Sequence, residues 1–234
     1  MLKQLVRNII YGYKASSHTY EQHLRKLGVD IGDNFRIYLP TETIIDLQNP
    51  YLLKIGDNVA LTGPVTIMTH DYSWKVFKNI DGRILGNQQP VIIGNNVFIG
   101  WGATILGGAV IEDNVIIGAK SLVTSFCEKN SVYAGIPAKR IMSIDEFIRK
   151  RQARQFDEAK TIQHMYEQKN GKAPDIRLFD SYFPIFTTQD NFSEIADIFD
   201  NRLRLEGNYD QSRQYLEKSS KTNSMSFDEF LKSK

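Results

Sequence analysis

This chain of 234 residues has little of several features that would point to particular classes of protein. Its single cysteine, Cys127, excludes an internal disulfide and fits a reducing compartment. Its formal net charge is only +2, which gives no electrostatic footprint for nucleic acid or an acidic membrane. No apolar run approaches the roughly 18 residues of a transmembrane helix, and the N-terminus lacks a signal-peptide pattern. We therefore expect a cytoplasmic protein without a transmembrane segment.

What the sequence does contain is a repeat with a period of six. An aliphatic residue stands at every sixth position over one stretch, namely at Ile93, Ile99, Ile105, Ile111, Ile117 and Val123. Four positions after each of the first five stands a small or β-branched residue: Val97, Ala103, Ala109, Val115 and Ser121. The same register appears earlier at Ile55, Leu61 and Ile67, and more faintly at Ile31 and Ile37. Ile31 and Ile55 are a multiple of six apart, so the register survives the irregular stretch between them.

A period of six fits neither an α-helix nor a simple strand. It favours a triangular coil with three short flat sides, in which the aliphatic residues point inward and successive coils pair as parallel strands. The alternative is a set of ordinary strands in a sandwich or an α/β fold, which predicts variable spacing between strands. The fixed register disfavours that alternative. We predict a mainly β protein with a parallel β-helix over residues 29–142.

The flanking segments have different patterns. Residues 1–28 carry apolar stripes at helical spacing, and residues 71–90 break the six-residue rule, which predicts an inserted functional loop. Ser143 and Glu146 form a capping-box pattern that predicts a helix start, and Asn170–Gly171 predicts its end. We expect residues 143–234 to form a helical extension with a partly mobile tail.

Two motifs carry a resemblance to a known family. The block IGNNVFIGWGATILGGAVIEDNVIIGAKSLVT and the later YAGIPAKRI resemble the hexapeptide-repeat O-acetyltransferases. The segment THDYSWKVFKNIDGRILGNQQPVIIGNNVFIG looks most like the branch that acts on bacterial surface and capsular polysaccharides. The resemblance covers roughly residues 29–142. It implies a left-handed β-helix and a homotrimer with sites between subunits. It further implies acetyl-coenzyme A as co-substrate, a saccharide acceptor and no required metal.

His70 is the candidate catalytic residue. The chain has four histidines, and only His70 lies inside a repeat coil, immediately before the 71–90 insertion, where the family carries its catalytic histidine. The resemblance therefore implies that His70 is a general base acting directly on the acceptor hydroxyl. The alternative is a structural histidine at a strand end. Three roles are open for Asp71, namely support of His70, sugar binding and turn formation.

The resemblance also implies contacts to the coenzyme. Gly102 would leave room for the thioester arm, and backbone groups of Gly118, Ala119 and Lys120 would pair with the pantetheine amides. Ile136, Pro137 and Ala138 would lie near the adenine. Lys139 and Arg140 would meet the phosphates, although a solvated basic pair is a common alternative.

Aromatic residues are candidates for the acceptor side. Trp101 stands where a coil normally presents a small outward residue, so it could stack on the sugar, wall the pantetheine channel or pack in a subunit interface. Tyr72, Trp74 and Lys75 in the insertion are further candidates for sugar contacts. Trp74 and Phe77 could instead anchor the insertion to a neighbouring subunit.

Proteins with other functions share this fold. Sugar-nucleotide pyrophosphorylases need a nucleotide-binding domain, for which the roughly 28 residues before the coils leave no room. A γ-class carbonic anhydrase needs three zinc-binding histidines, and one histidine in the coils cannot supply them. Xenobiotic acetyltransferases are the main alternative, and a non-catalytic trimeric scaffold is the more distant one.

Overall fold

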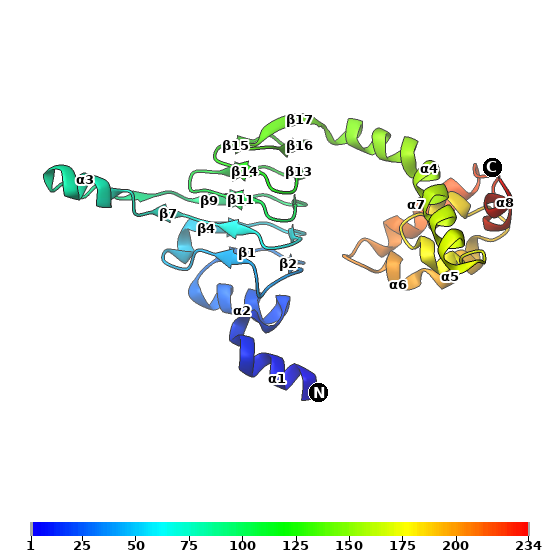
Figure 1. The fold of residues 1–234 in the computed structure, drawn as a ribbon, viewed down its shortest axis with the longest axis horizontal. Helices are drawn as coiled ribbons and strands as arrows, with labels where there is room; N and C mark the ends of the chain where they lie inside the picture. The colour runs from blue at the N-terminus through cyan, green and yellow to red at the C-terminus, as the bar shows by residue number, and fades with distance from the viewer. Residues whose placement is uncertain (1, 234) are drawn as a thin grey trace. The chain divides into compact units, whose positions relative to one another are not determined.

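The computed structural model describes residues 2–233, and the side chains of residues 6–233. The chain divides into two compact units, residues 1–147 and 148–234, which are taken one at a time below (Figure 1). None of the helices in the described residues is both long and apolar enough to cross a membrane.

Three parallel sheets make up the first unit, and successive strands visit them in turn. The first sheet contains β1 (Asp30–Ile31), β4 (Leu53–Ile55), β9 (Val91–Ile93), β12 (Val110–Ile111) and β15 (Phe126–Cys127). The second contains β2 (Arg36–Ile37), β5 (Ala60–Leu61), β10 (Phe98–Ile99), β13 (Val115–Ile117) and β16 (Ser131–Ala134), with β17 (Lys139–Ser143) added antiparallel at its edge. The third contains β3 (Ile44–Ile45), β6 (Thr66–Ile67), β11 (Thr104–Ile105) and β14 (Leu122–Val123). This is a parallel β-helix with three faces, as the repeat predicted.

The six-residue register determines what lies inside. Ile93 pairs with Ile111, Ile99 with Ile117 and Ile105 with Val123, so inward residues of successive coils stack in columns. All six of these side chains are at most 1% exposed. The small residues of the register, from Val97 to Ser121, are equally buried, which is why bulky side chains are absent there. The continuous column of aliphatic side chains is the main core of this unit.

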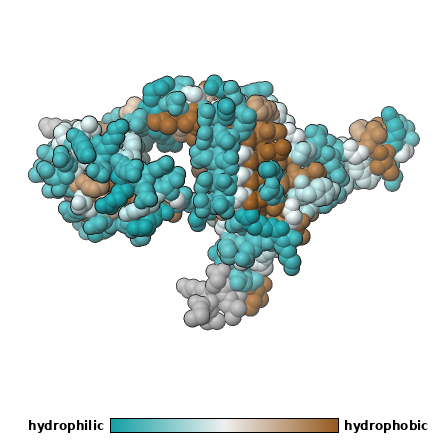
Figure 2. All heavy atoms as spheres, turned by 180° about the vertical axis from the view of Figure 1, so that it is seen from behind, coloured by the Kyte–Doolittle hydropathy of each residue, from teal (hydrophilic) through white to brown (hydrophobic). Residues whose placement is uncertain are grey.

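One corner of the coils is built from asparagines. Asn34, Asn58, Asn96, Asn114 and Asn130 all adopt the left-handed conformation, with φ between 54° and 58°. Asparagine tolerates this conformation better than most residues. The side chains also form ladder hydrogen bonds, such as Asn96 Nδ2 to Asn114 Oδ1 at 2.8 Å and Asn114 Nδ2 to Asn130 Oδ1 at 2.8 Å. Figure 2 shows a hydrophilic column along this unit with a hydrophobic strip beside it.

The irregular stretch between Ile31 and Ile55 keeps the register only at its ends. Ile31 pairs with Ile55 as the repeat predicted. Between them, however, Ile45 pairs with Ile67, so the strand on the third face comes two residues later than continuous hexads would place it. This displacement places Asp46 directly after β3.

The 71–90 insertion is more ordered than the loop that the sequence predicted. β7 (His70–Asp71) and β8 (Asn87–Gln88) pair antiparallel, and between them lies helix α3 (Trp74–Asp81). Figure 1 shows α3 extending away from the β-helix at the end of this two-stranded ribbon. Gly82 follows α3 and ends it, because it adopts the left-handed conformation, with φ of 86°, that is common after the last residue of a helix. Helix spacing over eight residues is too short a signal to separate from a loop.

The N-terminal segment is helical. It contains α1 (Leu2–Tyr11), the 3₁₀ turn η1 (Gly12–Ala15) and α2 (Ser17–Leu27). Ser16 and Thr19 form a capping box at the start of α2, and Gly28, with φ of 100°, ends it. Tyr20 and Leu24 on α2 are buried and belong to the same core cluster as the first coil. This helix therefore closes the open end of the aliphatic column.

The second unit is helical. Helix α4 (Ile144–Asn170) begins where Ser143 Oγ accepts a hydrogen bond from the Glu146 N–H at 3.1 Å, and it ends at Asn170, as predicted. After it come η3 (Ile176–Phe179), η4 (Phe183–Phe186), α5 (Phe192–Ile198), α6 (Asp200–Leu203), α7 (Tyr209–Ser220) and α8 (Phe227–Lys232). The tail that the composition predicted to be partly mobile contains α8, whose Phe230 is fully buried among Phe179 and Phe186.

Candidate active site

His70 borders a small cavity in the β-helix unit. The cavity has a volume of about 170 Å³ and is lined by Met68, Thr69, His70, Asp71, Asn87, Leu106, Gly107 and Thr124. His70 lies at the start of β7, where the chain leaves the third sheet for the 71–90 insertion, called the arm below because it carries α3. Its side chain is 11% exposed, so the imidazole is held in the wall of the cavity rather than in open solvent.

Asp46 orients the imidazole of His70, and the sequence did not predict this contact. Oδ2 of Asp46 lies 2.5 Å from Nδ1 of His70. The same carboxylate oxygen accepts hydrogen bonds from the Thr69 N–H at 2.9 Å and the Thr69 hydroxyl at 2.6 Å. Oδ1 accepts a further bond from the Gln48 N–H at 3.0 Å. Asp46 is 7% exposed, so this is a buried and fully hydrogen-bonded carboxylate.

The charge of Asp46 follows from these contacts. Burial by itself would raise its pKa, but hydrogen bonds from Thr69, Gln48 and His70 outweigh burial and lower the pKa from 3.8 to about 2. Asp46 is therefore ionised near neutral pH and can only accept hydrogen bonds. Because a carboxylate needs a donor, Nδ1 of His70 must carry a proton. In the neutral imidazole, Nε2 then holds the free lone pair that a general base needs.

The hydrogen bonds of Asp71 are to Ser73 and Asn87 rather than to the imidazole. Asp71 Oδ1 accepts a hydrogen bond from the Ser73 N–H at 2.8 Å, and its Oδ2 accepts one from Asn87 Nδ2 at 2.5 Å. The bonds from Ser73 and Asn87 lower the pKa of Asp71. Of the three readings left open by the sequence, the turn-forming one describes these contacts, because Asp71 ties the start of the arm to its return strand.

The acceptor-side candidates of the arm begin beside His70. The Tyr72 ring packs edge-on against the His70 ring at a centroid distance of 4.9 Å, and its hydroxyl donates to Gln48 Oε1 at 2.6 Å. Trp74 in turn packs edge-on against Tyr72 at 6.1 Å. Lys75 lies on α3 and is exposed. Tyr72 and Trp74 thus continue from His70 as a row of aromatic rings.

Trp101 is held between two neighbouring coils. A Cβ added at Gly63 would lie 2.1 Å from Trp101 Cδ1, so the indole lies directly against the backbone of the preceding coil. On the other side, Lys120 Nζ lies 4.1 Å from the centre of the indole ring, a cation–π contact. Trp101 remains 46% exposed. A Cβ at Gly102 would lie 2.8 Å from Lys120 Cδ, so the flexible lysine stem lies over this glycine. The expectation that Gly102 leaves room for a thioester arm stays a prediction.

Two of the backbone groups proposed for pantetheine are already engaged. The Gly118 N–H donates to the Tyr133 carbonyl at 2.8 Å, and the Lys120 N–H donates to the Trp101 carbonyl at 2.8 Å. The next coil and the preceding turn use these two N–H groups, so a contact of this segment with pantetheine would use other backbone groups, and that contact stays a prediction. Ala119 lies between them and is exposed.

The residues expected near the adenine and phosphates of the coenzyme lie where the coils end. Ile136 is 74% exposed, Pro137 follows it, and the Ala138 N–H donates to the Leu122 carbonyl at 2.8 Å. Lys139 and Arg140 are exposed on β17. Arg140 Nε lies 3.4 Å from Glu128 Oε2, an exposed ion pair that an anionic ligand could replace at small cost.

Cys127 is placed as a core residue. It is 2% exposed at the end of the aliphatic column, where it pairs in register with Ile111. Burial raises the pKa of its thiol to about 11. A buried, protonated thiol is a poor nucleophile, which disfavours a covalent acyl-enzyme at this cysteine.

Comparisons with known proteins agree with this architecture. Residues 90–125 match the family described as bacterial transferase hexapeptide (six repeats). Protein CapG of Staphylococcus aureus is 39% identical over 54% of this chain and 73% of CapG. This chain belongs to the hexapeptide-repeat acyltransferase family.

Further relatives of the family extend the comparison. The galactoside O-acetyltransferase of Escherichia coli K12 is 38% identical over 50% of this chain and 55% of its own length. The putative lipopolysaccharide biosynthesis O-acetyl transferase WbbJ of the same strain is 33% identical over 38% and 49%. Among solved structures, a hexapeptide-repeat acetyltransferase of Vibrio cholerae O1 biovar eltor, complexed with acetyl coenzyme A, is 22% identical over 49% of this chain and 60% of its own, with a TM-score of 0.42. The chain thus spans about half the length of the two Escherichia coli relatives.

Proposed function

We propose that this protein is an O-acetyltransferase that moves the acetyl group of acetyl-coenzyme A to a hydroxyl of a saccharide, in the biosynthesis of a surface polysaccharide. The observation that carries the proposal is the Asp46–His70 pair at the cavity, because it presents an imidazole with a defined free nitrogen. The names of the relatives support the reaction class and the acceptor class. We also propose that the protein is cytoplasmic.

In the proposed mechanism, His70 Nε2 takes the proton of the acceptor hydroxyl as its oxygen attacks the thioester carbonyl. The imidazolium that forms stays hydrogen-bonded to the ionised Asp46, which stabilises its positive charge. Collapse of the tetrahedral intermediate breaks the carbon–sulfur bond, and His70 returns the proton to the departing thiolate. The products are the acetyl ester and free coenzyme A, and no enzyme group is acylated.

We further propose that three copies of a left-handed β-helix assemble with their sites between neighbours. Large apolar side chains point outward from the coils, among them Ile92 (38% exposed), Phe98 (44%) and Phe126 (55%). Such a surface is costly in water unless a partner covers it. In this arrangement the pantetheine channel would be walled by Trp101, Gly102, Gly118, Ala119 and Lys120. The adenine and phosphates would lie near Ile136, Pro137, Ala138, Lys139 and Arg140. Asp71, Tyr72, Trp74 and Lys75 would lie on the acceptor side.

The test is release of free thiol from acetyl-coenzyme A in the presence of a panel of saccharides and a panel of antibiotics. We expect saccharides to stimulate release and His70→Ala to abolish it. His164→Ala is the matched control, because His164 is exposed on α4 in the other unit and should be dispensable. Stimulation by antibiotics alone would replace the saccharide acceptor with a xenobiotic one. If neither panel stimulates release, or if His70→Ala retains full activity, the proposal fails.

A separate measurement addresses the assembly. We expect a mass of three chains in sedimentation or native mass spectrometry at micromolar concentration. A monomer under those conditions would contradict a site shared between subunits.

A further inference from the structure

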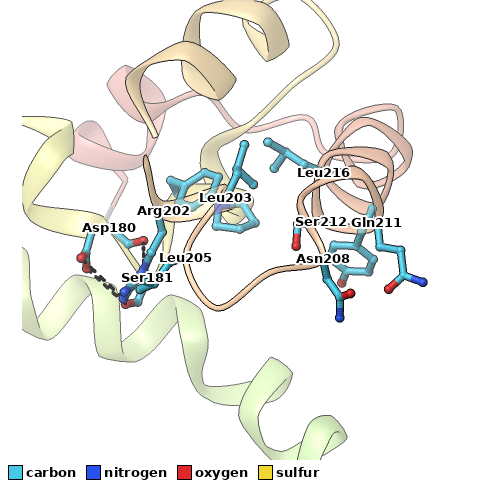
Figure 3. A pocket seen from close by; sticks show the side chains of 12 residues that line it. Asp180, Ser181, Arg202, Leu203, Leu205, Asn208, Gln211, Ser212 and Leu216 are labelled. Atoms are coloured by element: carbon cyan, nitrogen blue, oxygen red, sulfur yellow. Dashed lines mark hydrogen bonds and ion pairs between the residues drawn. The ribbon is translucent and has the colours of Figure 1, made fainter. Parts of the chain in front are cut away.

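The helical unit contains a larger cavity than the one beside His70. Its volume is about 640 Å³, within the range of ligand sites in proteins. It is lined by Asp180, Ser181, Phe183, Pro184, Arg202, Leu203, Leu205, Asn208, Gln211, Ser212, Tyr215 and Leu216 (Figure 3). All of these residues belong to residues 148–234, so the proposed acetyl transfer makes no use of them.

One wall of this cavity is a single face of helix α7. Gln211, Ser212, Tyr215 and Leu216 follow the spacing of three and four residues that places side chains on one helix face. Asn208, the N-cap residue with φ of 55°, precedes the helix and lines the same cavity. A face that served only for packing would be apolar throughout. Here only Leu216 is buried, at 1% exposure, while Tyr215 is 60% exposed. Within the part of the chain that the structure describes, the side-chain amides of Asn208 and Gln211 hold no hydrogen bond, so their donors and acceptors are available.

The opposite wall is polar and fixed in position. Figure 3 shows Asp180, Ser181 and Arg202 together on the side of the cavity across from Ser212, Asn208 and Gln211. Arg202 Nη2 donates to Ser181 Oγ at 2.5 Å and lies 3.5 Å from Asp180 Oδ2, while its Nε donates to the Asp180 carbonyl at 3.3 Å. The guanidinium is therefore held in place, and its charge is balanced by the Asp180 carboxylate.

Between these walls lie apolar side chains. Phe183, Leu203 and Leu216 are each at most 6% exposed and belong to one core cluster with Phe199. The lining thus combines an apolar base, an exposed aromatic ring, two free amides and one balanced charge pair. The balanced pair disfavours a strongly anionic ligand such as a nucleotide, and the free amides disfavour a purely apolar one.

We infer that this cavity is a saccharide-binding site, which holds the chain of the acceptor polymer while a terminal hydroxyl is acetylated elsewhere on the enzyme. A sugar ring has an apolar face, which suits the Tyr215 ring, and a rim of hydroxyls, each a donor and an acceptor, which suits Asn208, Gln211 and the Asp180–Arg202 pair. The inference rests on the proposed function for its link to acetyl transfer. Binding of the saccharide itself is independent of that link.

The experiment applies the full-length protein to an array of neutral and acidic bacterial polysaccharide fragments, with calorimetry on the fragment that binds best. We expect Tyr215→Ala to weaken binding by about tenfold, the loss of one aromatic contact. Tyr215→Phe keeps the ring and should bind like the wild type. Tyr51→Ala is the matched control, because Tyr51 is also a largely exposed tyrosine, at 74%, and belongs to the other unit. Equal melting temperatures would show that each variant is folded.

Two outcomes overturn the inference: no fragment binds the wild type, or Tyr215→Ala and Gln211→Ala bind with unchanged affinity. The His70→Ala variant separates this inference from the proposed function. We expect it to bind the fragment normally while transfer is lost. Tyr215→Ala should raise the KM for long acceptors only and leave kcat on a short acceptor unchanged. If the wild type binds the fragment but transfers no acetyl group to any saccharide, the proposed function fails and the binding site stands.

Discussion

Asp46 and His70 are 24 positions apart in the chain, and their side chains meet at 2.5 Å between Oδ2 and Nδ1. The contact spans one full coil of the β-helix, from the residue after β3 to the first residue of β7. The contact fixes the tautomer of His70, because an ionised carboxylate at Nδ1 requires the proton there and leaves the lone pair on Nε2. Asp46 acts through His70 and is therefore a positioning residue.

Replacing the carboxylate by an amide tests this role. In Asp46→Asn the side chain can donate as well as accept, so the imidazole loses its fixed tautomer and the stabilisation of its positive charge. We expect kcat to fall by about 100-fold or more, with little change in the KM of either substrate. Asp30→Asn is the control, because Asp30 is an exposed carboxylate on the first sheet that pairs with Lys54 and has no part in the proposed site. Steady-state kinetics that show equal losses in the two variants would contradict the assignment.

The same carboxylate makes stability depend on pH at the acid end. The pKa of Asp46 is lowered in the folded state, so its contribution is fully present above the ordinary value of 3.8 and is lost as pH falls through about 2. A shift of this size corresponds to about 2 kcal/mol. We expect the difference in unfolding free energy between wild type and Asp46→Asn to shrink over that range. Urea unfolding at a series of acidic pH values measures it, and a constant difference would count against the depressed pKa.

The close approach of Gly63 to the Trp101 ring gives a prediction about the coenzyme side. Gly63→Ala places a methyl group 2.1 Å from Trp101 Cδ1, so the indole must leave its position under Lys120. If Trp101 walls the pantetheine channel, the KM for acetyl-coenzyme A should rise by about tenfold with a smaller effect on kcat. Gly86→Ala is the matched control, since a Cβ there meets nothing within 4 Å. An unchanged KM for acetyl-coenzyme A in Gly63→Ala would remove Trp101 from the channel.

The aliphatic column predicts that two isoleucines of consecutive strands differ greatly in their contribution to the free energy of unfolding. Ile99 is fully buried, whereas Ile92 points outward at 38% exposure. Ile99→Ala should therefore lower the unfolding free energy by about 2–5 kcal/mol. Ile92→Ala should cost clearly less in the isolated chain. Chemical denaturation under conditions that keep one oligomeric state provides the comparison, and equal losses would mean that the register is misassigned.

The sequence by itself determined the parallel coils. Burial of Ile93 to Val123 at every sixth position follows from the period alone, because only one side of each short strand can face the column. It also determined that His70 stands where the coils are interrupted and that a helix starts after Ser143. These features are local or strictly periodic, so the order of the residues alone is enough to predict them.

Only the tertiary structure decided which residues meet. The partner of His70 is Asp46 rather than its neighbour Asp71, because the irregular coil puts β3 two residues late and brings Asp46 under Thr69 and His70. The N–H groups of Gly118 and Lys120 donate to the Tyr133 and Trp101 carbonyls, partners that only the stacking of the coils brings within reach. The cavity on α7 likewise depends on packing against Arg202 and Phe183, which lie on other elements. Contacts of this kind depend on distances between segments, and no local pattern in the sequence encodes them.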